Sequence, residues 1–175
     1  MSLLRSSLLL ALAACAAAPA AHAARGFEIR DLAKLDRYSS PVLAADGKTV
    51  VYARRVVDFA ANKGSTALWV QDTGAKTPSP RRLTPEGWNV NSPALSNDGK
   101  TVYFLSGKSG TQQLYAIPLT GGTPKALTDL PLDVGAFKFS PDGSRIALGL
   151  ETYADCKSDL ACTKRLLDEI GRAHV

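Results

Sequence analysis

Apolar runs alternate with turn signals along most of the chain, and one pattern occurs three times. Each copy has a short apolar stretch, an Asp-Gly pair, one or two polar residues, and then a run of β-branched or aromatic residues. The pairs are Asp46-Gly47, Asp98-Gly99 and Asp142-Gly143. Successive aspartates are 52 and 44 residues apart, close to the roughly 40 to 50 residues of one propeller blade.

The runs around each Asp-Gly pair predict four short strands in a complete copy. First strands are predicted at residues 40–43, 92–95 and 136–139, and second strands at 49–53, 101–105 and 145–148. Third strands are predicted at 67–70 and 113–117, and fourth strands at 81–84 and 125–128, after turns rich in Gly or Pro. Four antiparallel strands joined by turns form one blade.

The Asp-Gly pairs have a structural interpretation. Pro141 fixes φ at the first corner of a turn, the Asp142 side chain can bond to its own backbone, and Gly143 supplies a positive φ. Gly47 and Gly99 repeat the last role. Calcium binding is the weaker alternative, because no stretch has the D-x-D-x-D-G spacing that surrounds one ion with oxygens.

The predicted fold class is all-β, an incomplete β-propeller of about two and a half four-stranded blades with a short N-terminal and a short C-terminal helix. The blades are 40–91, 92–135 and a partial blade at 136–155. One blade cannot bury its two apolar faces alone, so neighbouring blades must cover them. Two and a half blades cannot close a ring of four to eight, so we expect this segment by itself to aggregate or partly unfold.

Short helices are predicted on both sides of the blades. In the lead-in, residues 24–39, the apolar Ile29, Leu32 and Leu35 recur every three residues, and Asp31 is a possible N-cap. After the blades, residues 156–169 form a cysteine loop and a helix in which Ser158 can act as the N-cap.

Cys156 and Cys162, six positions apart, are predicted to form a local disulfide. Two free buried thiols are the alternative. A metal site is favoured less, because structural zinc usually needs four ligands.

The N-terminus is predicted to be a signal peptide, residues 1–23, with Arg5 before an apolar run at 8–18 and a cleavage signature at Ala21-His22-Ala23. The mature chain is therefore expected to be exported, to the periplasm or outside the cell. Lipid attachment at Cys15 is an alternative. No stretch has the roughly 20 apolar residues of a confident membrane span.

The C-terminal residues 170–175, Ile-Gly-Arg-Ala-His-Val, match the translation of a sequencing adapter, ATC GGA AGA GCA CAC GTC. We interpret them as an assembly artefact that cuts the gene short; a coincidental polar terminus is the alternative. Genuine genomic reads that encode these six residues would exclude the artefact.

The two histidines, His22 and His174, lie in these end segments, so residues 24–169 cannot form a Ser-His-Asp set or a His-bearing zinc site. Without Arg5 and Arg172, 19 basic residues stand against 16 acidic ones, a net charge of +3. This excess is too small to indicate a nucleic-acid partner. No cofactor motif is present, and the pairs Arg54-Arg55 and Arg81-Arg82 are interpreted as solvated strand or loop ends.

The lead-in Gly26-Phe27 with Asp31-Leu32 and Leu35, the Ser40-Pro41-Val42-Leu43 stretch and the Ser140-Pro141-Asp142-Gly143 turn resemble the start of exported serine peptidases. The family is the prolyl oligopeptidase family, of the acylaminoacyl-peptidase or dipeptidyl-aminopeptidase type. The resemblance implies a β-propeller before an α/β-hydrolase domain, with the propeller limiting the access of small peptides to a Ser-Asp-His site. No catalytic residue of that family has a counterpart in this sequence.

Two other functions remain open at this stage. A noncatalytic, TolB-like periplasmic propeller that binds protein partners would use the same blade turn. A propeller enzyme with its site in the central channel is disfavoured, because no cluster of carboxylates or other ligands is evident. The fold alone does not decide among these functions.

Overall fold

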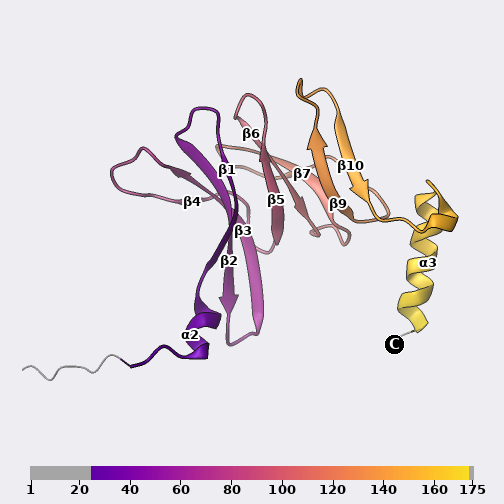
Figure 1. The fold of residues 1–175 in the computed structure, drawn as a ribbon, viewed down its shortest axis with the longest axis horizontal. Coiled ribbons are helices and arrows are strands. Elements are labelled where there is room, and N and C mark those ends of the chain that lie inside the picture. The colour runs from indigo at the N-terminus through magenta and orange to yellow at the C-terminus, as the bar shows by residue number, and fades with distance from the viewer. Residues whose placement is uncertain (1–24, 174–175) are drawn as a thin grey trace, which may run out of the picture. The chain divides into compact units, whose positions relative to one another are not determined.

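A computed structural model describes residues 25–173 (Figure 1). The chain divides into two units, one ending at Asp31 and the other beginning at Leu32. Near this division lies the predicted first helix, α2 (Ile29–Lys34). The Asp31 carboxylate accepts the backbone N–H of Glu28 at 2.9 Å and pairs with Arg25 at 2.5 Å. Asp31 therefore lies in the first turn and bonds back to the residue before the helix, so its prediction as the N-cap was wrong.

Two four-stranded antiparallel sheets and one two-stranded sheet follow. Blade 1 contains β1 (Arg37–Leu43), β2 (Thr49–Asp58), β3 (Lys63–Asp72) and β4 (Arg81–Arg82). Blade 2 contains β5 (Val90–Leu95), β6 (Thr101–Ser106), β7 (Gln113–Pro118) and β8 (Lys125–Ala126). The partial blade 3 contains β9 (Val134–Phe139) and β10 (Ile146–Leu150). Each sheet pairs strands that follow one another in sequence, which confirms the predicted all-β propeller class.

The fourth strands are shorter than predicted, with two residues each. In blade 1 the Leu83 N–H still bonds to the Leu68 carbonyl at 2.8 Å, but the Leu68 N–H bonds to the Thr84 hydroxyl at 3.0 Å. Thr128 repeats this bond to Leu114 at 2.9 Å in blade 2. A side-chain hydroxyl thus replaces a backbone carbonyl at the end of each ladder, and the regular pairing stops there.

The central hairpin of blade 1 is longer than predicted. β2 and β3 have ten residues each and pair out to Asp58 and Lys63, whereas β6 and β7 have six. The second strand was predicted to end at Ala53, just before two arginines. In the structure these arginines continue the strand, since both pair with residues of β1 and β3.

Blade 2 is covered on both faces, because the side chains of β6 alternate between its two neighbours. Val102 and Phe104 belong to a core shared with blade 1, while Leu105 belongs to a second core shared with blade 3. All three side chains are fully buried. The predicted stacking of blades is therefore visible within blade 2, where one strand supplies two cores.

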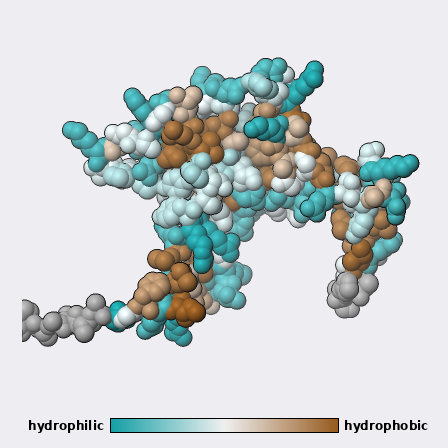
Figure 2. Space-filling model, in the orientation of Figure 1, coloured by the Kyte–Doolittle hydropathy of each residue, from teal (hydrophilic) through white to brown (hydrophobic). Residues whose placement is uncertain are grey.

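A 3₁₀ turn, η1 (Ala154–Cys156), and a helix, α3 (Leu160–Ala173), end the described chain. The N-cap of α3 is Asp159, whose carboxylate accepts the Cys162 N–H at 3.0 Å. The prediction of Ser158 was wrong by one residue, because α3 begins at Leu160 and the residue before it supplies the cap. Brown apolar surface is visible on the segments of α2 and α3 (Figure 2). None of the helices within residues 25–173 is long and apolar enough to cross a membrane.

Candidate functional site

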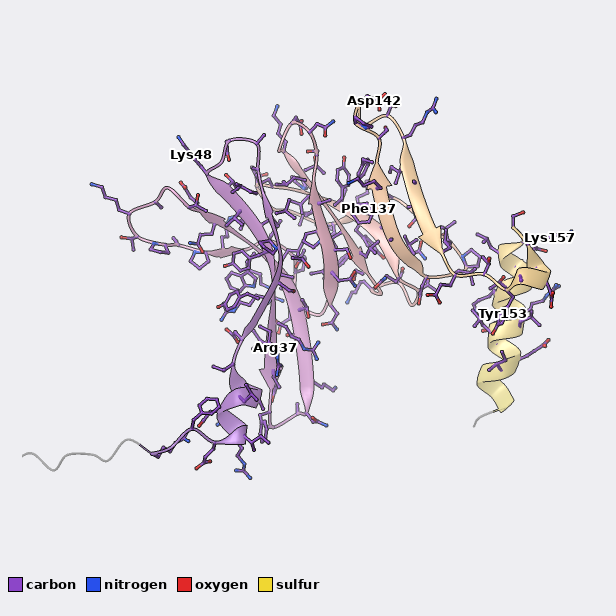
Figure 3. All side chains as sticks on the ribbon, viewed as in Figure 1. Arg37, Lys48, Phe137, Asp142, Tyr153 and Lys157 are labelled. Carbon is purple, nitrogen blue, oxygen red and sulfur yellow. A yellow bond between two sulfur atoms is a disulfide. The ribbon has the colours of Figure 1, made fainter. Side chains whose placement is uncertain are left out.

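The three Asp-Gly turns are built in the same way. In each, the glycine N–H bonds back three residues, at 3.0 Å for Gly47, 2.9 Å for Gly99 and 2.8 Å for Gly143. The three glycines have φ of 67°, 67° and 72°, a conformation that other residues rarely adopt. Figure 3 shows Lys48 and Asp142 at this end of the blades, and Arg37 at the opposite end.

The aspartate of each turn accepts the backbone N–H two residues later, at 2.8 Å for Asp46, 3.1 Å for Asp98 and 3.0 Å for Asp142. Hydrogen bonds to the ionised carboxylate lower the pKa of all three aspartates. The largest cause is the Lys48 N–H for Asp46, and the Ser96 hydroxyl, followed by the Lys100 N–H, for Asp98. The Ser140 hydroxyl, and after it the Ser144 hydroxyl, lower the pKa of Asp142 to about 2. The aspartates thus lie within their own turns, and no group of metal-ligating side chains is found among residues 25–173.

A hydrogen bond joins the second and third turns. The Asn97 amide donates to the Pro141 carbonyl at 2.7 Å, and Tyr103 lies with its ring centroid 4.3 Å from that of Phe139. A cavity of about 290 Å³ lies beside them, lined by Asp98 and Asp142 among others. Both carboxylates are already bonded within their turns, so we interpret the cavity as part of a structural contact between blades.

At the opposite end of the blades, two residues that the sequence analysis missed tie neighbouring blades together. The side-chain oxygen of Asn89, just before β5 of blade 2, accepts the N–H of Thr66 in blade 1 at 3.1 Å. In the same way Asp133, just before β9 of blade 3, accepts the N–H of Gln112 in blade 2 at 2.5 Å. Both residues lie nine positions before the aspartate of their Asp-Gly pair. That constant offset is the signal that could have revealed them.

The buried Gln113 holds the connection between blades 2 and 3. Its amide donates to the Thr111 hydroxyl at 2.9 Å and to the Leu130 and Leu132 carbonyls at 3.0 and 3.2 Å. Its oxygen accepts from Thr128 at 2.7 Å and from the Leu130 N–H at 3.0 Å. Every polar atom of this side chain is used, so its role is to fix the connection.

The arginine pairs are not simply solvated ends, which corrects that interpretation. Arg54 bonds to the Asp36 carboxylate at 2.5 Å, and its guanidinium lies 4.8 Å from the Trp69 ring centroid. Arg81 donates to the Leu119 carbonyl of blade 2 at 2.8 Å. Arg54 therefore makes contacts within blade 1, and Arg81 joins blade 1 to blade 2.

Cys156 and Cys162 are joined by a disulfide, with Cα atoms 5.6 Å apart. The bond links η1 to the first turn of α3, and the Tyr153 N–H donates to the Thr163 hydroxyl at 3.3 Å beside it. A cavity of about 490 Å³ lies between α3 and the chain before β9, lined by Asp133, Glu151 and Lys164 among others. Lys164 is already paired with Asp168, so this cavity holds no evident acid–base set.

The described residues do not contain a Ser-His-Asp set. Residues 25–173 contain no histidine, and the candidate residues of the turns, junctions and disulfide are separated along the blades. The described residues form a stack of sheets in which hydrogen bonds join neighbouring blades. Such an arrangement is suited to binding or scaffolding.

Residues 41–155 match the family described as the dipeptidyl peptidase IV (DPP IV) N-terminal region. The chain belongs to this family. The match confirms the resemblance to the prolyl oligopeptidase family that the lead-in and the blade turn indicated. It begins within β1 and ends at the cysteine loop, so this family covers all three blades.

Two curated peptidases are similar in sequence. The chain is 30% identical over 117 residues to the uncharacterized peptidase YuxL of Bacillus subtilis, covering 66% of this chain and 18% of that protein. It is 29% identical over 112 residues to dipeptidyl-peptidase 5 of Porphyromonas gingivalis, covering 64% of this chain and 16% of that protein. The chain thus spans less than a fifth of the length of these relatives.

Solved structures share the fold. An acylaminoacyl peptidase of Pyrococcus horikoshii aligns with a TM-score of 0.58 at 16% identity, over 76% of this chain and 20% of that one. The β-propeller domain of the trilobed protease of Pyrococcus furiosus aligns with a TM-score of 0.51 at 16% identity, over 66% of this chain and 34% of that one. At this identity the likeness supports the propeller fold alone.

Proposed function

We propose that these residues are the N-terminal propeller segment of an exported serine peptidase that acts on small peptides. In this proposal the segment limits the access of substrates to a catalytic α/β-hydrolase domain encoded further along the same gene. The observation that carries the proposal is the family match across all three blades, together with two peptidase relatives. The absence of histidine from residues 25–173 fits a segment whose chemistry is supplied elsewhere.

Labelling by a fluorophosphonate probe tests the catalytic part of the proposal. The protein expressed from the intact gene should be labelled at a serine outside residues 25–173, and a chain limited to residues 25–173 should not be. An intact protein that binds partners but is never labelled would favour a noncatalytic, TolB-like propeller instead.

Substrate length tests the proposed control of access. The intact protein should cleave peptides of a few residues and leave an unfolded protein such as reduced casein uncut, because the blades would exclude long chains. Equal cleavage of both would contradict a gating role. N-terminal sequencing of the secreted protein tests export, and Ala24 is the expected first residue.

A further inference from the structure

Two arginines lie opposite each other at the end of blade 1 that is remote from the Asp-Gly turns. Arg37 opens β1 and pairs directly with Arg55 of β2. Residues directly opposite in an antiparallel pair have side chains on the same face of the sheet, with Cβ atoms about 4.5–5.5 Å apart. Like charges in such a position destabilise the pair unless something neutralises them.

No carboxylate among residues 25–173 neutralises this arginine pair. Neither guanidinium makes an ion pair or hydrogen bond in the described part of the chain, and both residues are exposed. The nearest aspartate in sequence, Asp36, is bonded to Arg54, whose side chain lies on the other face of β2. The arginine pair is therefore a concentration of positive charge without an internal partner.

A glycine leaves room for the Arg55 guanidinium. A Cβ atom added to Gly64 of β3 would lie 2.3 Å from an Arg55 guanidinium nitrogen, so the guanidinium lies flat on the β3 backbone. Only a residue without a side chain leaves this space open.

Further hydrogen-bond donors lie next to the arginine pair. Thr66 is the residue opposite Arg55 on β3, so its hydroxyl lies on the same face. The Asn89 oxygen accepts the Thr66 N–H, which leaves the Asn89 NH₂ group as a donor. Arg37, Arg55, Thr66 and Asn89 thus form a row of neighbours from three strands and the junction with blade 2.

The repeat shows that this arrangement is special to blade 1. Arg37 lies nine residues before Asp46, the position occupied by Asn89 in blade 2 and Asp133 in blade 3. Those two side chains accept a backbone N–H from the preceding blade. A guanidinium cannot accept a hydrogen bond, so Arg37 cannot make this contact and presents N–H donors at this position instead.

We propose that Arg37 and Arg55 bind the carboxylate of a peptide, with Thr66 and Asn89 as additional donors. Two guanidinium groups suit a carboxylate because each presents N–H groups in a planar fork. The identity of the ligand as a peptide rests on the proposed peptidase function. The presence of an anion site at this end of blade 1 rests on the residues alone.

Paired peptides test the proposal on the intact protein, inactivated with fluorophosphonate so that nothing is cleaved. Acetyl-Ala-Ala and its C-terminal amide differ only in the carboxylate, and isothermal titration calorimetry compares their affinities. We expect the carboxylate form to bind about tenfold more tightly, since hydrogen bonds to charged groups are the stronger ones. Arg37→Gln and Arg55→Gln should each remove most of this difference.

Three controls make the result specific. Arg145→Gln removes another exposed arginine, in the third Asp-Gly turn, and should leave the difference intact. Gly64→Ala keeps every charge but displaces the Arg55 guanidinium, so it should weaken carboxylate binding as well. Each variant should retain the thermal midpoint of the parent within about 2 °C, because exposed substitutions rarely change stability by more than about 0.5 kcal/mol.

Equal affinity for the carboxylate and amide peptides would overturn the proposal, as would binding that Arg37→Gln and Arg55→Gln leave unchanged. Inorganic phosphate that binds the parent as tightly as the carboxylate peptide would show a general anion site, and would overturn the peptide assignment. An intact protein that fluorophosphonate does not label would contradict the peptidase function, while these affinities would still decide whether the anion site exists.

Discussion

The two faces of blade 2 meet different neighbours, and the comparison shows what stabilises a stack of blades. Toward blade 1, Trp88, Phe104 and Tyr115 form an aromatic group with ring centroids 5.0–6.2 Å apart. Phe104 and Tyr115 belong to a core of ten buried residues. Toward blade 3, the buried core has only Leu105, Leu114 and Val134. The remaining side chains on that side, such as Tyr103 and Phe137, are partly exposed.

The difference follows from the number of strands on the far side. Blade 1 covers blade 2 with four strands, whereas blade 3 supplies β9 and β10 only. Ile146, on β10, remains 40% exposed. Blade 2 is therefore covered completely on the side of blade 1 and incompletely on the side of blade 3. We expect the interface between blades 1 and 2 to carry most of the stability.

Equivalent leucines on the third strands provide the strongest test. Leu68 and Leu114 are both fully buried and make the same backbone bonds, but Leu68 faces the larger core and Leu114 the smaller one. We expect Leu68→Ala to lower the free energy of unfolding by about 3–4 kcal/mol and Leu114→Ala by about 2–3 kcal/mol. Urea unfolding followed by tryptophan fluorescence measures both. Equal losses, or a larger loss at Leu114, would contradict the ranking of the interfaces.

The junction residues should have smaller effects. Asn89→Ala and Asp133→Ala each remove the acceptor of a backbone N–H, which should cost about 1 kcal/mol. The matched changes Asn89→Asp and Asp133→Asn keep a side-chain oxygen in place, so they should preserve most of the stability. If the alanine and the conservative variants unfold at the same urea concentration, the hydrogen bonds contribute nothing to blade stacking.

The sequence predicted the parts of this fold that depend on local patterns. Turn positions and strand order follow from Asp-Gly pairs and apolar runs, which act over a few residues. The end of β2 was missed because Arg54 is retained in the strand by Asp36 and Trp69, contacts that lie 18 and 15 residues away along the chain. The paired arginines Arg37 and Arg55 were missed for the same reason, since only strand register brings them together.

The helix caps show a different limit. Ser158 and Asp159 are both good capping residues, and the choice between them depends on where the turn between η1 and α3 ends. The disulfide and the left-handed Lys157, with φ of 52°, determine that point. Sequence pattern located the helix correctly but could not resolve a difference of one residue.

The disulfide lies outside both blade interfaces, so its removal should separate local from global stability. A variant with both Cys156→Ser and Cys162→Ser should exchange the backbone amides of α3 about tenfold faster, because the bond tethers its first turn. The urea midpoint should stay close to that of the parent. Reduction of the unmodified protein should give the same exchange pattern. A drop in midpoint as large as that of Leu114→Ala would instead make the bond part of the blade 2–3 interface.

Acid sensitivity should be the smallest effect, and it should differ between the turns. A carboxylate whose pKa is lowered by folding stabilises the protein above its unfolded pKa, near 4, and this stabilisation is lost as the pH falls through the folded value. For Asp142 the window runs from about 4 down to about 2. Asp142→Asn should therefore flatten the decline of the urea midpoint over this range.

Asp46→Asn should flatten the acid decline less than Asp142→Asn does. Asp46 accepts two backbone N–H groups and the Thr49 hydroxyl, whereas Asp142 accepts two serine hydroxyls with its backbone bond. Asp155→Asn is the control, since its carboxylate accepts no hydrogen bond within residues 25–173. Urea midpoints at pH 5, 4, 3 and 2 give the comparison. An Asp142→Asn protein that loses stability as steeply as the parent would show that the turn hydrogen bonds do not link proton binding to folding.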